Sequence, residues 1–248
     1  SLSKTTKAIL NEYGIKLNKN LGQNYLIDRN KRDQIIQFGN LTKDDVVLEI
    51  GPGIGTLTIE LAKRVKKVIA IEQDSNICQI LENRLKKENI DNVELINDDA
   101  LNVEFPKFDK IISNLPYQIS SPITFKFLNY DFQLAILMYQ KEFASRMNGK
   151  VGSKDYSRLS AMLYFKCDVD LLTGVSAESF IPKPKVDSTV VRLTPKLPEL
   201  NGQLKHLNIN EINEKDFKTY SKFVKALFQH RNKKVKNFLD VGAITHEE

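Results

Sequence analysis

The sequence predicts an α/β fold built around a mostly parallel, doubly wound sheet. Five short apolar runs recur about every 20 residues within the first 140 positions. They are VVLEI at 46–50, KVIAIE at 67–72, VELIND at 93–98, KIISNL at 110–115 and LAILMYQ at 134–140. Runs this apolar are typical of strands that are buried on both faces, as in parallel sheets. Between them, residues 56–65 and 76–87 place apolar side chains three and four apart, which predicts amphipathic helices that cover the sheet.

After position 150 the pattern changes and predicts an antiparallel edge to this sheet. Residues 157–165 have helical periodicity, and two strand-like runs follow at 166–175 and 187–194. The segment FIPKPKV at 180–186 separates these runs. A connection this short between neighbouring strands favours antiparallel pairing.

The C-terminal residues predict a small helical domain. The sequence TPKLP at 194–198 predicts a linker, because prolines break both helices and strands. We therefore expect a main domain over residues 1–195 and a helical domain over residues 196–248. One face of the expected helix is apolar and carries Phe217, Tyr220, Val224, Leu227 and Phe228. Because only a short tail follows this helix, we expect the domain to be a shortened one.

Composition excludes several classes of protein. No stretch of the 248 residues approaches the roughly 18 uncharged apolar residues of a membrane helix, and the first residues lack the apolar centre of a secretory signal. We therefore expect a cytoplasmic protein. Cys78 and Cys167 are far apart, and three histidines lie at 206, 230 and 246 without ligand spacing. Neither a disulfide framework nor a metal site is expected.

Charge is concentrated near the two ends of the chain. Residues 1–32 carry seven basic and two acidic side chains, and residues 218–236 carry seven basic side chains and no acid. Two basic segments that flank a near-neutral or acidic body are suited to binding a phosphate backbone on either side of a reaction site. The alternative is a solvated, lysine-rich surface. The residues predicted to contact nucleic acid are Lys16, Lys19, Arg29, Arg231, Lys233, Lys234 and Lys236.

A glycine-rich turn follows the first predicted strand. Gly51, Gly53 and Gly55 have the spacing G-x-G-x-G, whereas a dinucleotide-binding turn needs a third glycine at Thr56. This spacing is common in enzymes that bind S-adenosylmethionine, which has no pyrophosphate. Glu72 and Asp99 end the next two strands, where they could accept hydrogen bonds from a ribose and from an adenine amino group. Taken singly, each acid could simply face water; together they predict an adenosine-binding crevice.

The fourth predicted strand ends in Asn114-Leu115-Pro116-Tyr117. The lone pair of an adenine N6 is delocalised into the ring, so methylation requires a more tetrahedral nitrogen. The side-chain oxygen of Asn114 and the carbonyl of Leu115 could accept the two amino hydrogens. Pro116 stiffens the turn, and Tyr117 offers a flat face for an unstacked adenine. The alternative is an ordinary turn.

With these motifs the sequence resembles the ribosomal RNA adenine dimethyltransferases, the KsgA family. The resemblance rests on five segments and a weaker sixth, LFQHRNKKVKNFL at 227–239. The five are LGQNYLID at 21–28, EIGPGIGTLT at 49–58, NDDAL at 97–101, NLPYQISSPI at 114–123 and FIPKPKVDS at 180–188. It implies a Rossmann-like methyltransferase sheet that uses S-adenosylmethionine to dimethylate two adjacent adenosines of small-subunit ribosomal RNA during ribosome biogenesis.

The resemblance also assigns site residues. Residues 1–30 are expected to cover the cofactor and contact RNA, and Phe180 is expected to stack on the target base opposite Tyr117. Tyr25 stands where relatives often have phenylalanine. The cofactor positions that the resemblance implies are Gln23, Asn24, Leu26, Gly51, Gly53, Glu72, Gln73, Asp99, Ala100 and Asn114.

Two other functions remain open from sequence. An antibiotic-resistance enzyme that methylates an adenosine of large-subunit RNA would share the glycine turn and the Asn-Leu-Pro-Tyr segment. A binding factor for ribosome assembly could keep the fold without turnover, although retention of Glu72, Asp99, Asn114 and Tyr117 argues against it. We expect a monomer whose partner is small-subunit ribosomal RNA or the assembling subunit.

Overall fold

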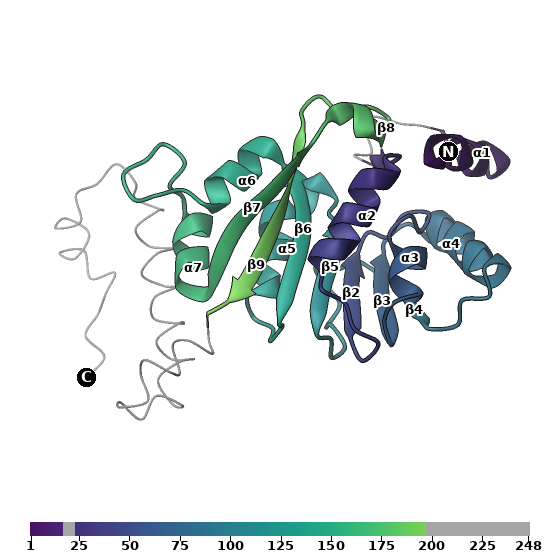
Figure 1. Cartoon of the computed structure of the whole chain (residues 1–248), viewed down its shortest axis with the longest axis horizontal. Coiled ribbons are helices and arrows are strands. Elements are labelled where there is room, and N and C mark those ends of the chain that lie inside the picture. The colour runs from purple at the N-terminus through teal and green to yellow at the C-terminus, as the bar shows by residue number, and fades with distance from the viewer. Residues whose placement is uncertain (17–22, 197–248) are drawn as a thin grey trace. The chain divides into compact units, whose positions relative to one another are not determined.

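The computed structural model describes residues 1–16 and 23–196 (Figure 1). It divides into two compact units. Of the described residues, the first contains 1–16, 23–144 and 170–194, and the second contains 145–169 together with Pro195 and Lys196. The predicted helical domain at 196–248 lies outside the described residues, except for Lys196, so the predicted domain boundaries stay a prediction.

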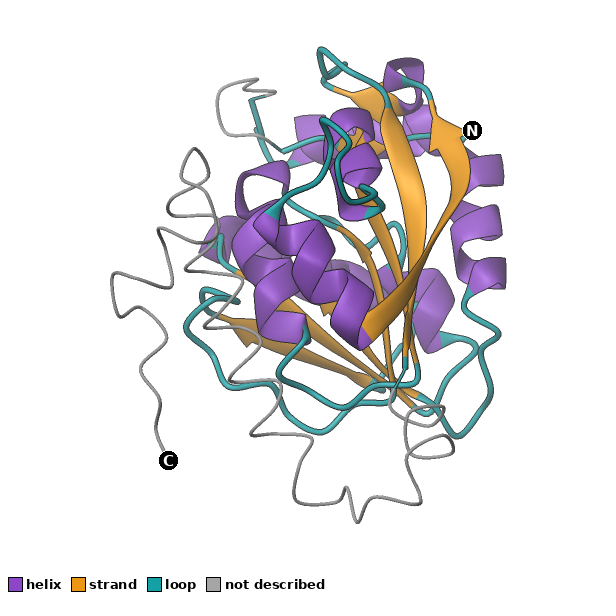
Figure 2. Ribbon diagram, turned by 90° about the vertical axis from the view of Figure 1, so that its left-hand side faces the viewer, coloured by secondary structure: helices purple, strands orange, loops and turns teal. Residues whose placement is uncertain are grey.

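A seven-stranded sheet forms the centre of the fold, with strand order β4-β3-β2-β5-β6-β9-β7. Strands β2, β3, β4, β5 and β6 are parallel, and β9 pairs antiparallel with β6. Figure 2 shows helices beside these strands. The bounds are β2 Val46–Ile50, β3 Lys67–Glu72, β4 Val93–Asn97, β5 Lys110–Asn114, β6 Leu134–Gln140, β7 Cys167–Val175 and β9 Ser188–Pro195. The predicted α/β class, the parallel order and the antiparallel edge are confirmed.

Burial explains why the apolar runs form these strands. Strands β2, β3, β5 and β6 are buried along nearly their whole length, as expected for central strands covered on both faces. Their side chains join a core with Leu26, Ile36, Leu61 and Phe180. The charged Lys110 in this core is paired: its ammonium group donates to Asp45 Oδ2 at 2.9 Å and to the Asn40 carbonyl at 2.7 Å.

Four helices and a small sheet were not predicted. The helices are α1 Leu2–Glu12, α2 Arg29–Phe38, α5 Ser120–Phe127 and α6 Lys141–Met147. The small sheet pairs β1 Tyr25–Leu26 antiparallel with β8 Phe180–Ile181. The predicted helices are present as α3 Thr58–Ala62, α4 Ser75–Lys87 and α7 Arg158–Lys166, of which α3 is shorter than expected.

The predicted linker is wrong at its first residues. Strand β9 ends at Pro195, one residue beyond the predicted strand run at 187–194, whereas the proline pattern predicted a break there. A proline is tolerated there because the end of a strand has fewer ladder hydrogen bonds to lose. In the second unit, α7 begins with a capping box, in which Ser157 and Ser160 each accept a hydrogen bond from the other's backbone amide.

Among the described residues, no helix has the length and apolar character needed to cross a membrane. The same part of the chain has no group of three or more His, Cys, Asp or Glu side chains placed to hold a metal ion.

Candidate active site

A cavity of about 600 Å³ opens at the carboxyl ends of β2, β3, β4 and β5. Every residue predicted for cofactor binding or methyl transfer lines this cavity, with the exception of Phe180. Those lining residues are Gln23, Asn24, Leu26, Gly51, Gly53, Glu72, Gln73, Asp99, Ala100, Asn114, Leu115, Pro116 and Tyr117. Asn24 and Asn114, 90 residues apart in sequence, therefore meet at this site, and the carboxyl ends of the parallel strands bring the other segments together.

The glycine turn packs directly against the Asn-Leu-Pro-Tyr segment. Gly51 has a φ of +68°, and a Cβ added there would lie 2.8 Å from Pro116 Cγ. The Gly51 amide donates to the carbonyl of Ile71 at 2.9 Å, which fixes the turn to the end of β3. Any side chain at position 51 would be strained and would displace Pro116. The two motifs are thus one structural unit.

Glu72 at the end of β3 is a buried and oriented carboxylate. Its Oε2 accepts from the Gly53 amide at 3.2 Å, and its Oε1 accepts from the Asp74 amide at 3.1 Å. Burial raises the pKa of Glu72, while the two amides act in the opposite direction. Each oxygen retains lone-pair capacity for a ligand, so the carboxylate could accept from two hydroxyl groups at once.

Asp99 lies on a turn after β4 that is fixed from both sides. Its Oδ1 accepts from the Leu101 amide at 2.9 Å, and its Oδ2 accepts from the Asn102 side chain at 3.3 Å. Behind the turn, the Lys126 ammonium donates to the carbonyls of Ala100, at 2.7 Å, and Val103. Asp99 is therefore held at the rim of the cavity and can accept a hydrogen bond from a ligand.

The side-chain amide of Asn114 is oriented by the N-terminal segment. Its Nδ2 donates to the backbone carbonyl of Asn24 in a long hydrogen bond of 3.5 Å. With the nitrogen directed toward Asn24, the acceptor Oδ1 lies on the other side of the amide. This orientation is the one that the predicted role of Asn114 as an acceptor needs.

Tyr117 is anchored through its hydroxyl group. The Tyr117 Oη lies 2.5 Å from Ser188 Oγ, and Ser188 is the first residue of β9. Burial raises the pKa of Tyr117, so the phenol stays protonated and can donate to Ser188. Because Ser188 ends the segment FIPKPKVDS, this contact gives that segment a role at the site that sequence reasoning missed.

Phe180 has a different location from the one expected. Its side chain is only 2% exposed and packs in the main core, and it does not line the cavity. Its backbone pairs with Leu26 in the β1–β8 sheet, so it supports a cavity-lining residue. The role of Phe180 as a second stacking surface stays a prediction, and it would require the ring to become accessible.

All charged side chains that line the cavity are acidic. They are Glu49, Glu72, Asp74, Asp98 and Asp99, and the described lining includes no Lys, Arg or His. Such a cavity is suited to a cationic ligand and disfavours a phosphate.

Glu49 is the most buried of these acids and was not predicted. It is 2% exposed, and its Oε2 accepts from Thr58 Oγ1 at 2.7 Å. Burial and, to a smaller extent, the Glu72 carboxylate raise the pKa of Glu49 to about 8, against the effect of the Thr58 hydrogen bond. The sequence does contain a signal: an acid stands inside the apolar run VVLEI, immediately before the glycine turn.

The predicted RNA-contacting residues are only partly described. Lys16 is exposed, and the Arg29 side chain is 75% exposed with its Nε 3.8 Å from Asp33. Lys19, Arg231, Lys233, Lys234 and Lys236 lie outside the described residues. Neither described residue lines the cavity, so any contact they make is with a part of the substrate outside it.

Comparison with known proteins shows which family the sequence matches. The family model described as ribosomal RNA adenine dimethylase matches residues 14–247. A protein of Methanosphaera stadtmanae named probable ribosomal RNA small subunit methyltransferase A is 50% identical over 94% of this chain and 81% of its own length. A protein of the same name from Methanothermobacter thermautotrophicus is 47% identical over 94% of this chain and 79% of its own.

Two solved structures are similar in both fold and sequence. A dimethyladenosine transferase from Plasmodium falciparum superposes with a TM-score of 0.72 and is 36% identical, covering 86% of this chain and 74% of its own. The 23S rRNA methyltransferase ErmE superposes with a TM-score of 0.68 and is 30% identical, covering 88% of this chain and 84% of its own.

Proposed function

Because the chain belongs to the ribosomal RNA adenine dimethylase family, we propose that it dimethylates N6 of two adjacent adenosines in small-subunit ribosomal RNA during ribosome biogenesis. The methyl donor is S-adenosylmethionine, and the substrate is the RNA or the assembling subunit. The observation that carries this proposal is the convergence of Glu72, Asp99 and the Asn114–Tyr117 segment on one cavity. We further propose that the protein acts as a cytoplasmic monomer.

The donor set of the cavity fits S-adenosylmethionine. Glu72 would accept from the two ribose hydroxyls, and Asp99 would accept from the adenine amino group. Gly51 and Gly53 line the cavity without side chains, so the backbone of the turn can approach the nucleoside closely. The acidic lining suits a ligand of net positive charge, since the sulfonium and ammonium groups of S-adenosylmethionine outweigh its one carboxylate. When bound, this cofactor supplies an electrophilic methyl group on a positively charged sulfur.

In the proposed mechanism the protein acts by orienting the adenine. Asn114 Oδ1 and the Leu115 carbonyl accept the two amino hydrogens and direct the nitrogen lone pair toward the methyl group. The Tyr117 ring supports the unstacked base, and Ser188 restrains that ring through the phenol oxygen. A general base is unnecessary, because the methylated nitrogen is acidic enough to lose its proton to water. Rate enhancement then comes from proximity and in-line geometry.

The test is transfer of radiolabelled methyl groups to small subunits that lack the modification. Naked ribosomal RNA and large subunits serve as controls, and nucleoside analysis identifies the product. We expect N6,N6-dimethyladenosine with small subunits. Label in large-subunit RNA would instead favour methylation of 23S ribosomal RNA, the activity in the name of ErmE. Absence of label despite cofactor binding would contradict the enzymatic proposal and favour an assembly factor.

A further inference from the structure

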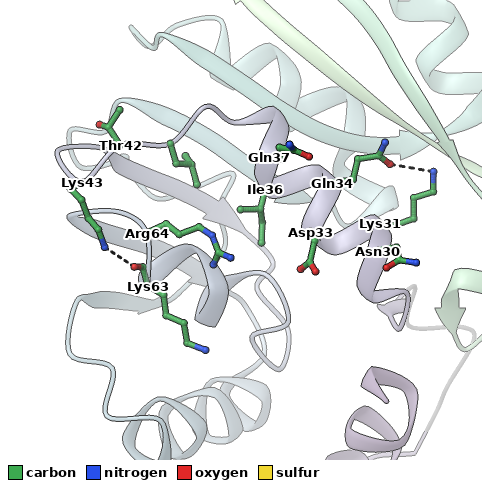
Figure 3. A pocket seen from close by; sticks show the side chains of 11 residues that line it. Asn30, Lys31, Asp33, Gln34, Ile36, Gln37, Thr42, Lys43, Lys63 and Arg64 are labelled. Carbon is green, nitrogen blue, oxygen red and sulfur yellow. Dashed lines mark hydrogen bonds between the residues drawn. The ribbon is translucent and has the colours of Figure 1, made fainter.

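A second concave surface lies along helix α2, and Figure 3 shows its side chains. This groove has a volume of about 1080 Å³ and is bounded by α2, the loop before β2 and the two residues that follow α3. It shares no lining residue with the acidic cavity. None of the motifs at the methyl-transfer site accounts for it.

The lining of this groove is cationic and rich in carboxamides. Four cationic side chains line it against a single carboxylate, Asp33. That carboxylate is already neutralised, with Arg32 at 2.8 Å and Arg29 at 3.8 Å. The four cations are Lys31, Lys43, Lys63 and Arg64, and the carboxamides are Asn30, Gln34 and Gln37. Cations combined with amide donors are the groups that proteins use to contact nucleic-acid phosphates and sugars.

The cations on the α3 side are held in place but remain accessible. Lys63 Nζ and Arg64 Nη1 share one carboxylate, Glu60, at 3.1 and 3.0 Å. Their side chains are 48% and 45% exposed. Lys43 Nζ donates to the Lys63 carbonyl at 2.8 Å, which brings these cations to one wall of the groove. Exposed ion pairs of this kind are weak, so a phosphate can compete for both cations.

Helix α2 connects the groove to the acidic cavity. Leu26 of β1 lines the cavity, and Asp28 then caps α2 by accepting from the Lys31 amide at 3.1 Å. The ten residues of α2 extend for about 15 Å, which matches about four phosphates along one strand of a duplex. Lys43 precedes β2, and Lys63 and Arg64 precede β3, so these cations lie at the amino ends of strands whose carboxyl ends form the cavity. A strand that places one base in the cavity would therefore meet them several nucleotides away, after running along α2.

We propose that this groove binds the sugar-phosphate backbone of the ribosomal RNA several nucleotides from the target adenosine, through Lys43, Lys63 and Arg64. The inference rests on the proposed function, since it takes the substrate to be RNA. The groove does not take part in methyl transfer. Its phosphate contacts determine which adenosine is positioned at the cavity, and they contribute salt-dependent affinity for RNA.

The test compares two double variants of the full chain that remove the same charge. Lys43→Gln with Lys63→Gln alters the groove, whereas Lys86→Gln with Lys107→Gln alters exposed lysines that do not line it. Binding of unmodified small-subunit ribosomal RNA is measured at several salt concentrations. For the groove variant we expect roughly tenfold weaker binding and a salt slope smaller by about two. Equal effects of the two double variants would overturn the proposal.

A third variant tests the opposite direction. Asp33→Asn removes the only acid of the groove, so it should tighten RNA binding by roughly twofold or more and steepen the salt slope. Misfolding cannot produce tighter binding, and unchanged or weaker binding would count against the groove. Methyl transfer by the unaltered protein distinguishes this proposal from the proposed function. If the protein transfers methyl groups but the groove variants bind RNA normally, only the RNA-binding role of the groove is refuted. If the protein transfers no methyl groups, the proposed enzymatic function is refuted.

Discussion

The cavity and the α2 groove have opposite charge although they lie in the same compact unit. Among the described residues, five acidic side chains and no basic one line the cavity, while four cations and one neutralised carboxylate line the groove. Under the proposed function, the first surface receives a small cation and the second a polyanion. The acidic lining also repels phosphate, so only an uncharged base is favoured at the methyl-transfer site. The separation implies that catalysis, cofactor affinity and RNA affinity can be altered one at a time.

The largest expected effect comes from Asn114→Ala. Without the side-chain acceptor the adenine amino group is misoriented, so methyl transfer should fall by about a hundredfold or more. RNA affinity and its salt dependence should stay unchanged, because Asn114 does not line the groove. Single-turnover transfer and RNA binding are measured on the same preparation, with the exposed Asn129→Ala as the matched control. Equal loss of transfer and RNA binding would contradict the assigned role.

Glu72→Gln should weaken cofactor affinity by roughly tenfold. The substitution preserves size and keeps one oxygen acceptor for either the Gly53 or the Asp74 amide. It places an NH2 group against the other amide and replaces a charged acceptor by a neutral one. Calorimetric titration with S-adenosylmethionine gives the affinity, and Glu82→Gln on the exposed face of α4 is the control. RNA binding should not weaken. A parallel loss of RNA affinity would show that the two surfaces are not independent.

Glu49 makes the stability of the cavity region depend on pH. Burial raises the pKa of Glu49 from its ordinary value of 4.5 to about 8, so the folded protein binds this proton more tightly than the unfolded chain. The contribution of protonated Glu49 to the stability of the folded protein is complete below about pH 4.5. This contribution is lost as the pH rises through about 8. Each pH unit in that window should lower the free energy of unfolding by at most about 1.4 kcal/mol.

Glu49→Gln is the variant that checks this pH dependence. It cannot ionise, yet its side-chain oxygen can still accept from Thr58. Thermal unfolding between these pH values should show a flatter profile for the variant than for the unaltered protein. Cofactor affinity should also increase toward pH 8 only in the unaltered protein, because a cationic ligand favours the ionised carboxylate. If the stability of the two proteins depended on pH in the same way, Glu49 would not be the group responsible for that dependence.

The sequence predicted the sheet and most of the cavity for physical reasons that can be named. Strands β2, β3, β5 and β6 are buried on both faces, so their composition is nearly uniform and easy to recognise. Glu72, Asp99 and Asn114 could be located because the carboxyl ends of parallel strands meet at one edge.

Features that depend on tertiary contacts were missed. Helix α2 buries only Ile35 and Ile36, so its sequence has a weak helical pattern and the groove beside it was not anticipated. Strand β1 has two residues and is defined only by its pairing with β8, 154 to 156 residues away in the chain. The same pairing accounts for the buried position of Phe180. Glu49 was missed because its pKa depends on burial, which no local pattern reports.

The smallest expected effect is the response of cofactor binding to salt. The cavity acids that would contact the cofactor are partly or fully buried, and buried charges are screened little by ions. Cofactor affinity should therefore change by no more than about twofold between roughly 50 and 200 mM salt, while RNA affinity falls by tenfold or more. Both titrations are made in the same buffers. If cofactor affinity followed the steep dependence of RNA, the exposed Asp98 and more distant charges would dominate its binding, and the cavity would act through its long-range field rather than through Glu72 and Asp99.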